Sequence, residues 1–181
     1  MRTASIERYL NSFGQEVVKK SKAMLHKDKG DTVLGKSISF KVEPDPSGLS
    51  VKFYMLDYGT FLDKGVSGNK KKRSFTNYKG QSEPTSYSYT TKQPPPEILS
   101  RWIIRKGLKP KGLGRGRDKN TGRFISNLAY IIGRNIKAKG IPSLSFFQVP
   151  FGIEYKKLKK DLLKAFEQDV LTYITTFTKH K

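Results

Sequence analysis

Pairs of carboxylates are the residues whose types and spacing come closest to a catalytic arrangement. Asp57 and Asp63 flank the sequence YGTFL at the end of a predicted strand, and Glu43 and Asp45 lie in a predicted turn. Two acids beside a basic surface could bind Mg²⁺ and support cleavage of a phosphodiester. The competing interpretation is structural, because turn residues and strand-end aspartates accept hydrogen bonds from backbone amides. We favour this second interpretation and expect no metal site and no cofactor.

The other residue types that perform catalysis are scarce or poorly placed. The chain has no cysteine, which excludes a disulfide, a thiolate metal site and a cysteine nucleophile. Its two histidines are His26, near a lysine-rich helix end, and His180, next to the last residue, and neither is placed as an oriented base. The sequence GLGRGR at 112–117 lacks the Gly-Lys-Ser/Thr of a nucleotide-binding loop, so it predicts a flexible basic loop. We therefore expect a protein that is not an enzyme.

Charge is the strongest signal in the composition. The 181 residues carry 36 Lys and Arg against 15 Asp and Glu, a net charge of +21. Two basic stretches dominate, KKKR at 70–73 and a glycine-rich basic loop at 105–123. Such an excess predicts contact with nucleic acid or with an acidic protein, although either stretch alone could be a solubilising loop. The candidate residues for this contact are Lys70, Lys71, Lys72, Arg73, Lys109, Lys111, Arg115, Arg117, Lys119 and Arg123.

The elements that must position these residues begin with a helix and a hairpin. Apolar residues recur at three- and four-residue steps over 6–24, which predicts an amphipathic helix that ends near 26–30. Residues 38–42 and 49–55 alternate apolar and polar side chains around the turn sequence EPDPSG, which predicts an antiparallel hairpin. Residues 66–96 have no usable periodicity, so we expect an extended loop or arm there.

The second half of the chain is predicted to be mainly helical. PPPE at 94–97 opens a helix with Trp102 on its core side, and a further helix is expected over 124–136. Residues 144–149 predict a short strand or an extended segment, and 155–177 predict a long amphipathic helix. The whole predicts a single α+β domain over 1–181. It has an N-terminal helix, a sheet based on an antiparallel hairpin, helices packed on that sheet, a long C-terminal helix and extended basic loops.

The order of several short motifs resembles that of the small neck, head–tail connector and tail-completion proteins of tailed bacteriophages. Tyr58-Gly59 follows a predicted strand, WIIRKG ends a helix at 102–107, and 129–140 follow the pattern A-x-x-I-x-x-x-I-x-x-x-G. The similar region covers 3–175 apart from 66–93. The resemblance implies a small α+β subunit without catalytic residues, which forms rings of six or twelve at the portal–tail joint while the genome passes down the lumen.

The resemblance also implies partners and a location. The expected partners are further copies of the chain, portal, neck or tail proteins of the virion, and double-stranded DNA in the lumen, with virion assembly in the host bacterial cytoplasm. No apolar run reaches the roughly 18 residues of a membrane span, so no membrane contact is expected. The candidate subunit-interface residues are Phe53, Tyr58, Phe61, Tyr78, Tyr87, Tyr89, Phe146 and Phe147. The alternative function is a stand-alone basic nucleic-acid-binding protein, in which the three tyrosines of the 66–96 segment could stack on bases.

Overall fold

The computed structural model describes residues 4–46, 48–108, 115–117 and 124–178. Its mixed helices and antiparallel strand pairs confirm the predicted α+β class. The range 1–181, treated above as one domain, consists of two compact units that are described separately here. Unit 1 comprises Met1–Asp63, Thr76–Ser82 and Leu144–Lys181, and unit 2 comprises Lys64–Phe75 and Glu83–Ser143.

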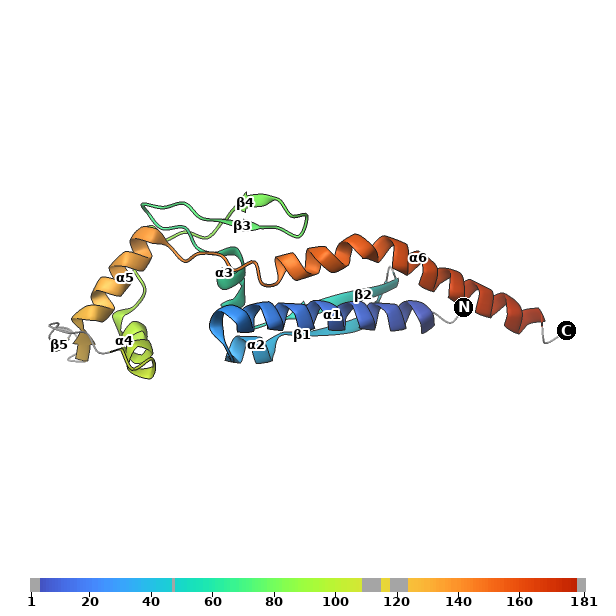
Figure 1. Cartoon of the computed structure of the whole chain (residues 1–181), viewed down its shortest axis with the longest axis horizontal. Helices are drawn as coiled ribbons and strands as arrows, with labels where there is room; N and C mark the ends of the chain where they lie inside the picture. Colours follow the sequence, from blue (N-terminus) through green and yellow to red (C-terminus); the bar gives the residue numbers. More distant parts are fainter. Residues whose placement is uncertain (1–3, 47, 109–114, 118–123, 179–181) are drawn as a thin grey trace. The chain divides into compact units, whose positions relative to one another are not determined.

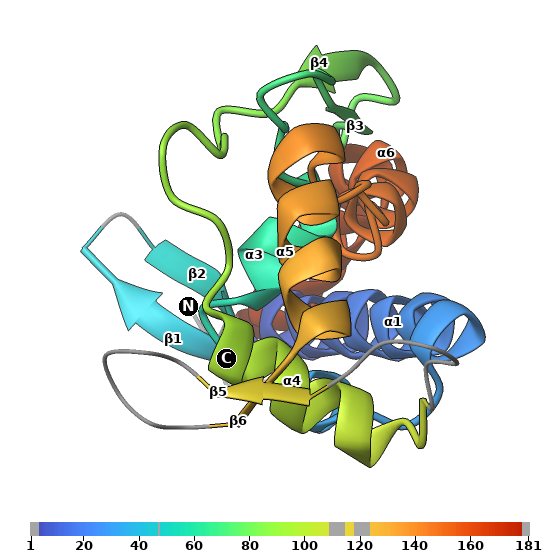
Figure 2. The ribbon, with the colours of Figure 1, turned by 90° about the vertical axis from the view of Figure 1, so that its left-hand side faces the viewer.

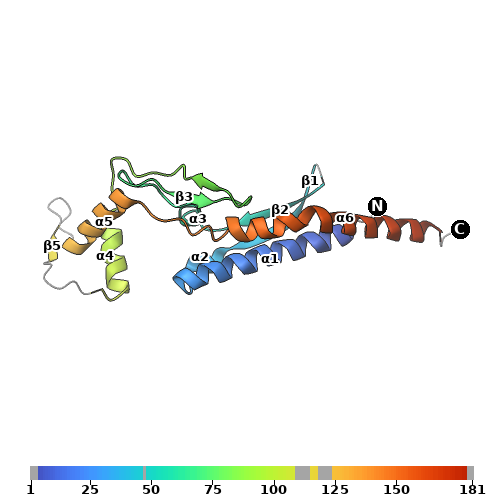
Figure 3. The ribbon, with the colours of Figure 1, turned by 45° about the horizontal axis from the view of Figure 1, so that its top comes forward.

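Two long helices frame unit 1. Helix α1 (Ala4–Lys29) and helix α6 (Gln148–Thr178) run antiparallel and side by side over a hairpin (Figures 1 and 3). The predicted stripe of α1 is confirmed, since Leu10, Phe13 and Val17 are all buried. Basic side chains in the last turn of α1 suit the negative end of the helix dipole. Gly30, at φ 67°, then ends the helix by donating its N–H to the carbonyl of His26.

The predicted hairpin is confirmed, and its first strand is longer than the sequence suggested. Strand β1 (Ser39–Asp45) pairs antiparallel with β2 (Gly48–Tyr54), so the strands take up most of the predicted turn sequence EPDPSG. The register places Phe40 opposite Phe53. The Phe40 ring lies so close to Gly14 of α1 that a Cβ there would meet it at 2.2 Å. The glycine therefore lets the helix backbone approach the hairpin.

The core of unit 1 lies where short elements join the helices. Its fully buried members are Leu25 of α1, Leu34 of α2 (Val33–Ser37), Ile38 and Phe146. An aromatic cluster adjoins this core, in which the Phe53 ring packs edge to face on Phe147 at 5.3 Å and on Phe151 at 6.0 Å between centroids. Edge-to-face packing at these distances adds stabilisation beyond the burial of area.

The last helix begins earlier than its apolar stripe predicts. Residues 144–149 do not form a strand, and α6 starts at Gln148 rather than near Tyr155. The chain tolerates Pro150 in the first turn because the first amides of a helix have no intrahelical acceptor. The carboxylate of Asp63, in α3 (Gly59–Lys64), takes two of those amides and accepts from the N–H of Phe147 at 2.8 Å and of Gln148 at 3.4 Å.

Replacing Asp63 with alanine is expected to destabilise unit 1 by roughly 1–3 kcal/mol, because two amide donors at a helix start lose their acceptor in a buried site. Chemical denaturation of Asp63→Ala measures this loss. Asp57→Ala is the matched control, since Asp57 is exposed and its removal should change the unfolding free energy by less than about 0.5 kcal/mol. Equal effects of the two substitutions would contradict the capping role of Asp63.

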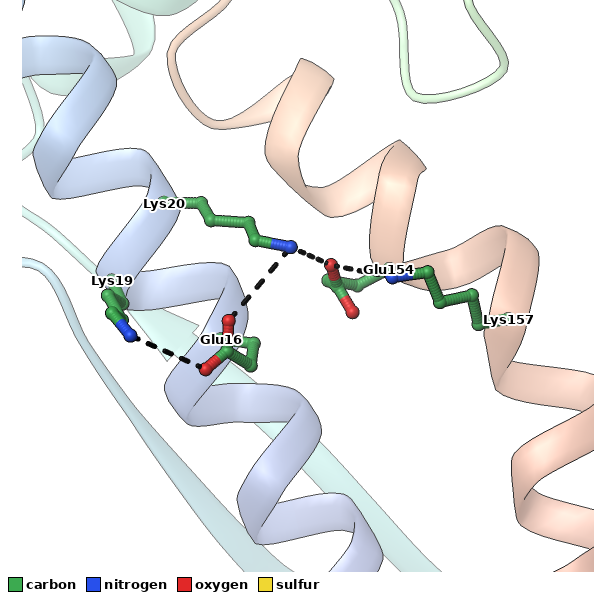
Figure 4. A network of polar contacts seen from close by, with 5 residues as sticks. All are labelled: Glu16, Lys19, Lys20, Glu154 and Lys157. Carbon is green, nitrogen blue, oxygen red and sulfur yellow. Dashed lines mark hydrogen bonds and ion pairs between the residues drawn. The ribbon is translucent and has the colours of Figure 1, made fainter.

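Charged contacts tie α1 to α6 along their length. The Lys20 ammonium reaches across from α1 and donates a hydrogen bond to the buried Glu154 carboxylate, which also pairs with Lys157 at 3.6 Å (Figure 4). Burial opposes ionisation of Glu154, but the hydrogen bond and charge of Lys20 outweigh it and hold the pKa of this carboxyl below its usual value. At the other end, the buried Asp169 of α6 accepts from the first amides of α1, those of Ser5 at 2.8 Å and Ile6 at 3.1 Å. Burial raises the pKa of Asp169, but these backbone hydrogen bonds lower it by more, so its pKa lies below the usual value.

Acid is therefore expected to destabilise unit 1. Both carboxyls have a lower pKa in the folded state than in the unfolded state, so the unfolded chain binds more protons when the pH falls. Their contribution is complete above the ordinary carboxyl pKa of about 4 and is lost as the pH drops through the lowered folded values. Urea unfolding across this range should show the loss. In the isosteric double variant Glu154→Gln with Asp169→Asn, the unfolding free energy should depend less on pH. An unchanged pH dependence would mean that these two carboxyls are not the cause of the acid destabilisation.

Unit 2 contains the remaining helices. Helix α4 (Pro96–Arg105) and helix α5 (Asn127–Lys139) pack against each other, with strand β6 (Phe124–Ser126) beside them and paired to β5 (Arg115–Arg117) (Figure 2). Two corrections to the sequence predictions arise here. Phe124 belongs to a strand rather than to the helix, and Trp102 is 42% exposed rather than part of the core, where Ile103 lies instead.

The segment expected as a loop or arm is tied down by backbone hydrogen bonds. Within unit 2, Val66 pairs with Ile141 in an antiparallel bridge and Ser67 pairs with Ser88 in a parallel one. The short strands β3 (Ser74–Thr76) and β4 (Ser82–Pro84) pair with each other. The sequence did not predict this structure because main-chain hydrogen bonds and close contacts at glycines hold the segment. Neither kind of contact produces a periodic pattern of apolar side chains.

Candidate basic surface and apolar groove

The first basic stretch is fixed against the end of a helix. The N–H groups of Asn69 and Lys70 donate to the carbonyls of Lys137 and Ala138 at 2.9 and 3.0 Å, and the Arg73 Nε donates to the carbonyl of Lys139 at 2.9 Å. These carbonyls belong to the last turn of α5, where no further intrahelical amide is available to them. The stretch therefore supplies hydrogen-bond donors to the last carbonyls of α5, and these bonds fix the backbone of the stretch in place.

Gly68 and Gly140 make this close approach possible. A Cβ on Gly68 would lie 2.2 Å from the Ala138 carbonyl oxygen, and one on Gly140 would lie 2.0 Å from that of Val66. Gly140 also has φ 71°, the left-handed conformation that commonly ends a helix. No larger residue fits either position without displacing backbone.

The docking brings together basic side chains that are far apart in the sequence. Lys70, Lys71 and Lys72 are exposed, Arg73 is half-buried, and the last turn of α5 adds Lys137 and Lys139 beside them. We call these six residues the α5-end cluster. Sequence reasoning missed its two α5 members, although lysines in the last turn before a helix-ending glycine are a recognisable signal. The cluster is suited to phosphate or carboxylate groups, which accept hydrogen bonds from ammonium and guanidinium groups.

The second basic stretch is only partly described. Lys109, Lys111, Lys119 and Arg123 lie outside the described residues. Arg115 and Arg117 lie on strand β5, where they pair in register with Ser126 and Phe124 of β6, so this part is a strand rather than the predicted loop.

Several aromatic residues predicted to form a subunit interface pack against other side chains of unit 1. Phe146 is fully buried, Phe53 and Phe147 belong to the aromatic cluster, and the Tyr78 ring packs edge to face on Phe151 and Tyr155 at 5.9 and 5.6 Å. Phe146 is therefore removed from the interface prediction, because a residue in the core of one copy cannot contact another. The sequence did not reveal this, because a core aromatic and an interface aromatic have the same local pattern.

The other interface candidates have surface of their own. Tyr58 and Phe61 of unit 1 are 45% and 42% exposed. Tyr87 and Tyr89 are half-buried in unit 2, where their backbone groups bond to Ser67, and burial raises the pKa of the Tyr89 phenol. Tyr58 and Phe61 are thus well placed to contact another molecule, and the half-buried Phe53 lines the apolar groove described below.

The carboxylates that suggested metal chemistry do not form a metal centre in the described parts of the chain. Asp63 caps α6, as the structural interpretation predicted, and Asp57 is an exposed residue before α3. Within the described residues, no group of three His, Asp or Glu side chains is arranged to hold a metal ion.

An apolar groove in unit 1 is a further feature that sequence reasoning missed. It has a volume of about 970 Å³ and lies between the first half of α1, strand β2 and residues 151–166 of α6. Its apolar walls include Ile6 and Leu10 of α1 and Leu162 of α6, and among the described residues that line it only Lys159 is charged. The apolar stripe of α6 supplies one wall of this groove, which stays open.

Comparison of the chain with protein-family models, with curated proteins and with solved structures found no match. A search of the described residues for membrane-spanning segments also found no helix that is both long and apolar enough. Function must therefore be inferred from the surfaces themselves.

Proposed function

We propose that this chain is a non-enzymatic structural protein of a bacteriophage virion, a ring-forming neck or tail-completion subunit through which the genome passes. The motif order in the sequence suggests this family, and the surfaces of the two units are consistent with it. The observation that carries the proposal is the amount of apolar surface left open. Nineteen large apolar or aromatic side chains among the described residues are more than a third exposed. Extended exposed apolar surface is typical of proteins that bury it against other subunits.

The distribution of charge between the two units supports contact with DNA in such a ring. Unit 2 carries eighteen basic and three acidic side chains, a net charge of +15, whereas unit 1 carries eighteen and twelve, a net charge of +6. Unit 2 thus holds most of the charge of +21 in 73 of the 181 residues. In a ring of such subunits, the basic units would repeat at regular intervals and present a field that attracts a polyanion.

Electron microscopy of the purified, nuclease-treated protein tests the proposal. Closed rings of six or twelve copies are the expected particles. Single copies at every concentration, with no ring upon addition of the matching portal or tail proteins, would contradict it.

The α5-end cluster favours one alternative, a stand-alone nucleic-acid-binding protein. Such a protein would bind duplex DNA as a monomer or dimer, with an affinity that falls steeply with salt because each neutralised phosphate releases counterions. The oligomeric state separates the two functions, since both predict DNA binding and only the first predicts a closed ring.

A further inference from the structure

The second half of α6 carries an apolar stripe that continues the wall of the groove. At 3.6 residues per turn, six side chains fall within an arc of about 100° on this helix. They are Leu163, Phe166, Val170, Tyr173, Ile174 and Phe177. The first two line the groove, and the last three are 45%, 51% and 68% exposed. One continuous apolar surface therefore leads from the groove to the end of the helix.

The end of α6 projects beyond the helix it packs on. Asp169 holds the first amides of α1, so residues 170–178 extend past the start of that helix by about 13 Å (Figure 1). Residues 171–178 are all exposed. We call residues 170–178 the α6 tail. It offers a free apolar ridge, whereas the groove offers an open apolar cleft in the same unit.

Charge favours another copy of the chain as the occupant of the groove. Two copies each with a net charge of +21 repel, so they can pack only through surfaces with little charge. The α6 tail has nine residues in a row without a charged side chain, and Lys159 is the one charged residue in the described lining of the groove. An acidic partner would find little to pair with on either surface.

The area matches a small contact between subunits. On the tail, Leu171 and the three exposed residues of the stripe end are each about half exposed, so each can bury roughly 100 Å² more. This gives roughly 400 Å² on the tail and, with a similar area of the facing groove, about 800 Å² per contact, in the range of weak or transient interfaces. In a closed ring each copy makes the contact twice, once through its tail and once through its groove.

We propose that the α6 tail of one copy docks in the groove of the next copy, head to tail. This inference rests on the proposed function, because a closed ring requires a contact between two different surfaces of the subunit. The groove and the tail are two such surfaces, and each copy carries one of each.

Crosslinking tests the contact directly, because the native chain has no cysteine. The full-length variant Lys159→Cys with Ile174→Cys places one thiol in the groove and one on the tail. These positions are about 22 Å apart along one helix, so a short bismaleimide cannot join them within a copy. A ladder of covalent dimers, trimers and larger species is expected. Lys19→Cys with Ile174→Cys is the control, since Lys19 is exposed on α1 outside the groove, and its ladder should be at least tenfold weaker.

Three outcomes would overturn the inference: equal ladders from the two variants, no crosslinks, or a product that stops at the dimer. The last would mean that two copies exchange tails mutually. A second variant, Ile174→Asp with Phe177→Asp, changes only exposed residues and should weaken self-association by about 100-fold or more. Rings that persist unchanged in this variant would leave the proposed function standing and remove the α6 contact. A crosslinked ladder from a protein that never forms closed rings would leave the α6 contact standing and remove the proposed function.

Discussion

Replacing Lys70, Lys71 and Lys72 together with alanine is expected to weaken binding of duplex DNA by about tenfold to a hundredfold at moderate salt. These lysines are exposed on a backbone that is fixed to the end of α5, beside the turn that carries Lys137 and Lys139. Each lysine that contacts a phosphate contributes about one unit to the slope of log affinity against log salt, so this slope should fall by up to about three. Fluorescence anisotropy of a labelled duplex across a salt series gives both quantities.

A control of equal charge separates a local contact from the overall field. Lys156, Lys160 and Lys164 are exposed on α6 in unit 1, so their replacement with alanine removes the same three charges elsewhere. That variant should lose much less affinity and slope. If the two triple variants behaved alike, binding would depend on net charge alone, and the α5-end cluster would not be a site.

Replacing Gly140 with alanine is expected to destabilise unit 2 by about 3 kcal/mol or more. The residue has φ 71°, which costs an L-residue roughly 1–2 kcal/mol, and its Cβ would lie 2.0 Å from the Val66 carbonyl oxygen. Relieving this clash means separating the 66–70 segment from the end of α5, which also disrupts the bonds that hold the basic stretch. Hydrogen exchange should therefore show faster exchange of the Asn69 and Lys70 amides, and DNA affinity should fall.

Gly107 provides the matched control in the same unit. It also has a positive φ, 63°, but a Cβ there would meet nothing within 4 Å. Gly107→Ala should cost only the conformational part, about 1–2 kcal/mol, and leave exchange at 69–70 unchanged. Equal effects at the two glycines would mean that conformation alone, and not the close approach of the backbones, makes Gly140 necessary.

Periodic side-chain patterns made much of the fold predictable. The stripe of α1, the alternation in β1 and β2 and the helix-start signal PPPE each report on local structure, and each element forms where it was expected. The start of α6 was misplaced by seven residues because its first turn depends on a cap from Asp63, 84 residues earlier in the chain. A tertiary contact of this kind leaves no local signal.

The candidate surfaces were predictable only in part. The basic stretch at 70–73 was evident from composition, but its partners Lys137 and Lys139 join it through backbone bonds that no side-chain pattern reveals. The groove was hidden for a different reason. An apolar stripe predicts that one face of a helix is buried, but it does not show whether the same chain or another molecule buries it. The last nine residues of α6 extend beyond the start of α1, so α1 does not bury the end of the stripe.

The central claim is that this chain is a subunit of a closed ring, and mass photometry of the nuclease-treated protein at moderate salt, with and without a short DNA duplex, tests it most directly. The account predicts a discrete species of six or twelve times the 20.6 kDa mass of the chain without DNA. A monomer that shows no larger species at any concentration, and binds the duplex only at low salt, would contradict it and favour the stand-alone nucleic-acid-binding protein.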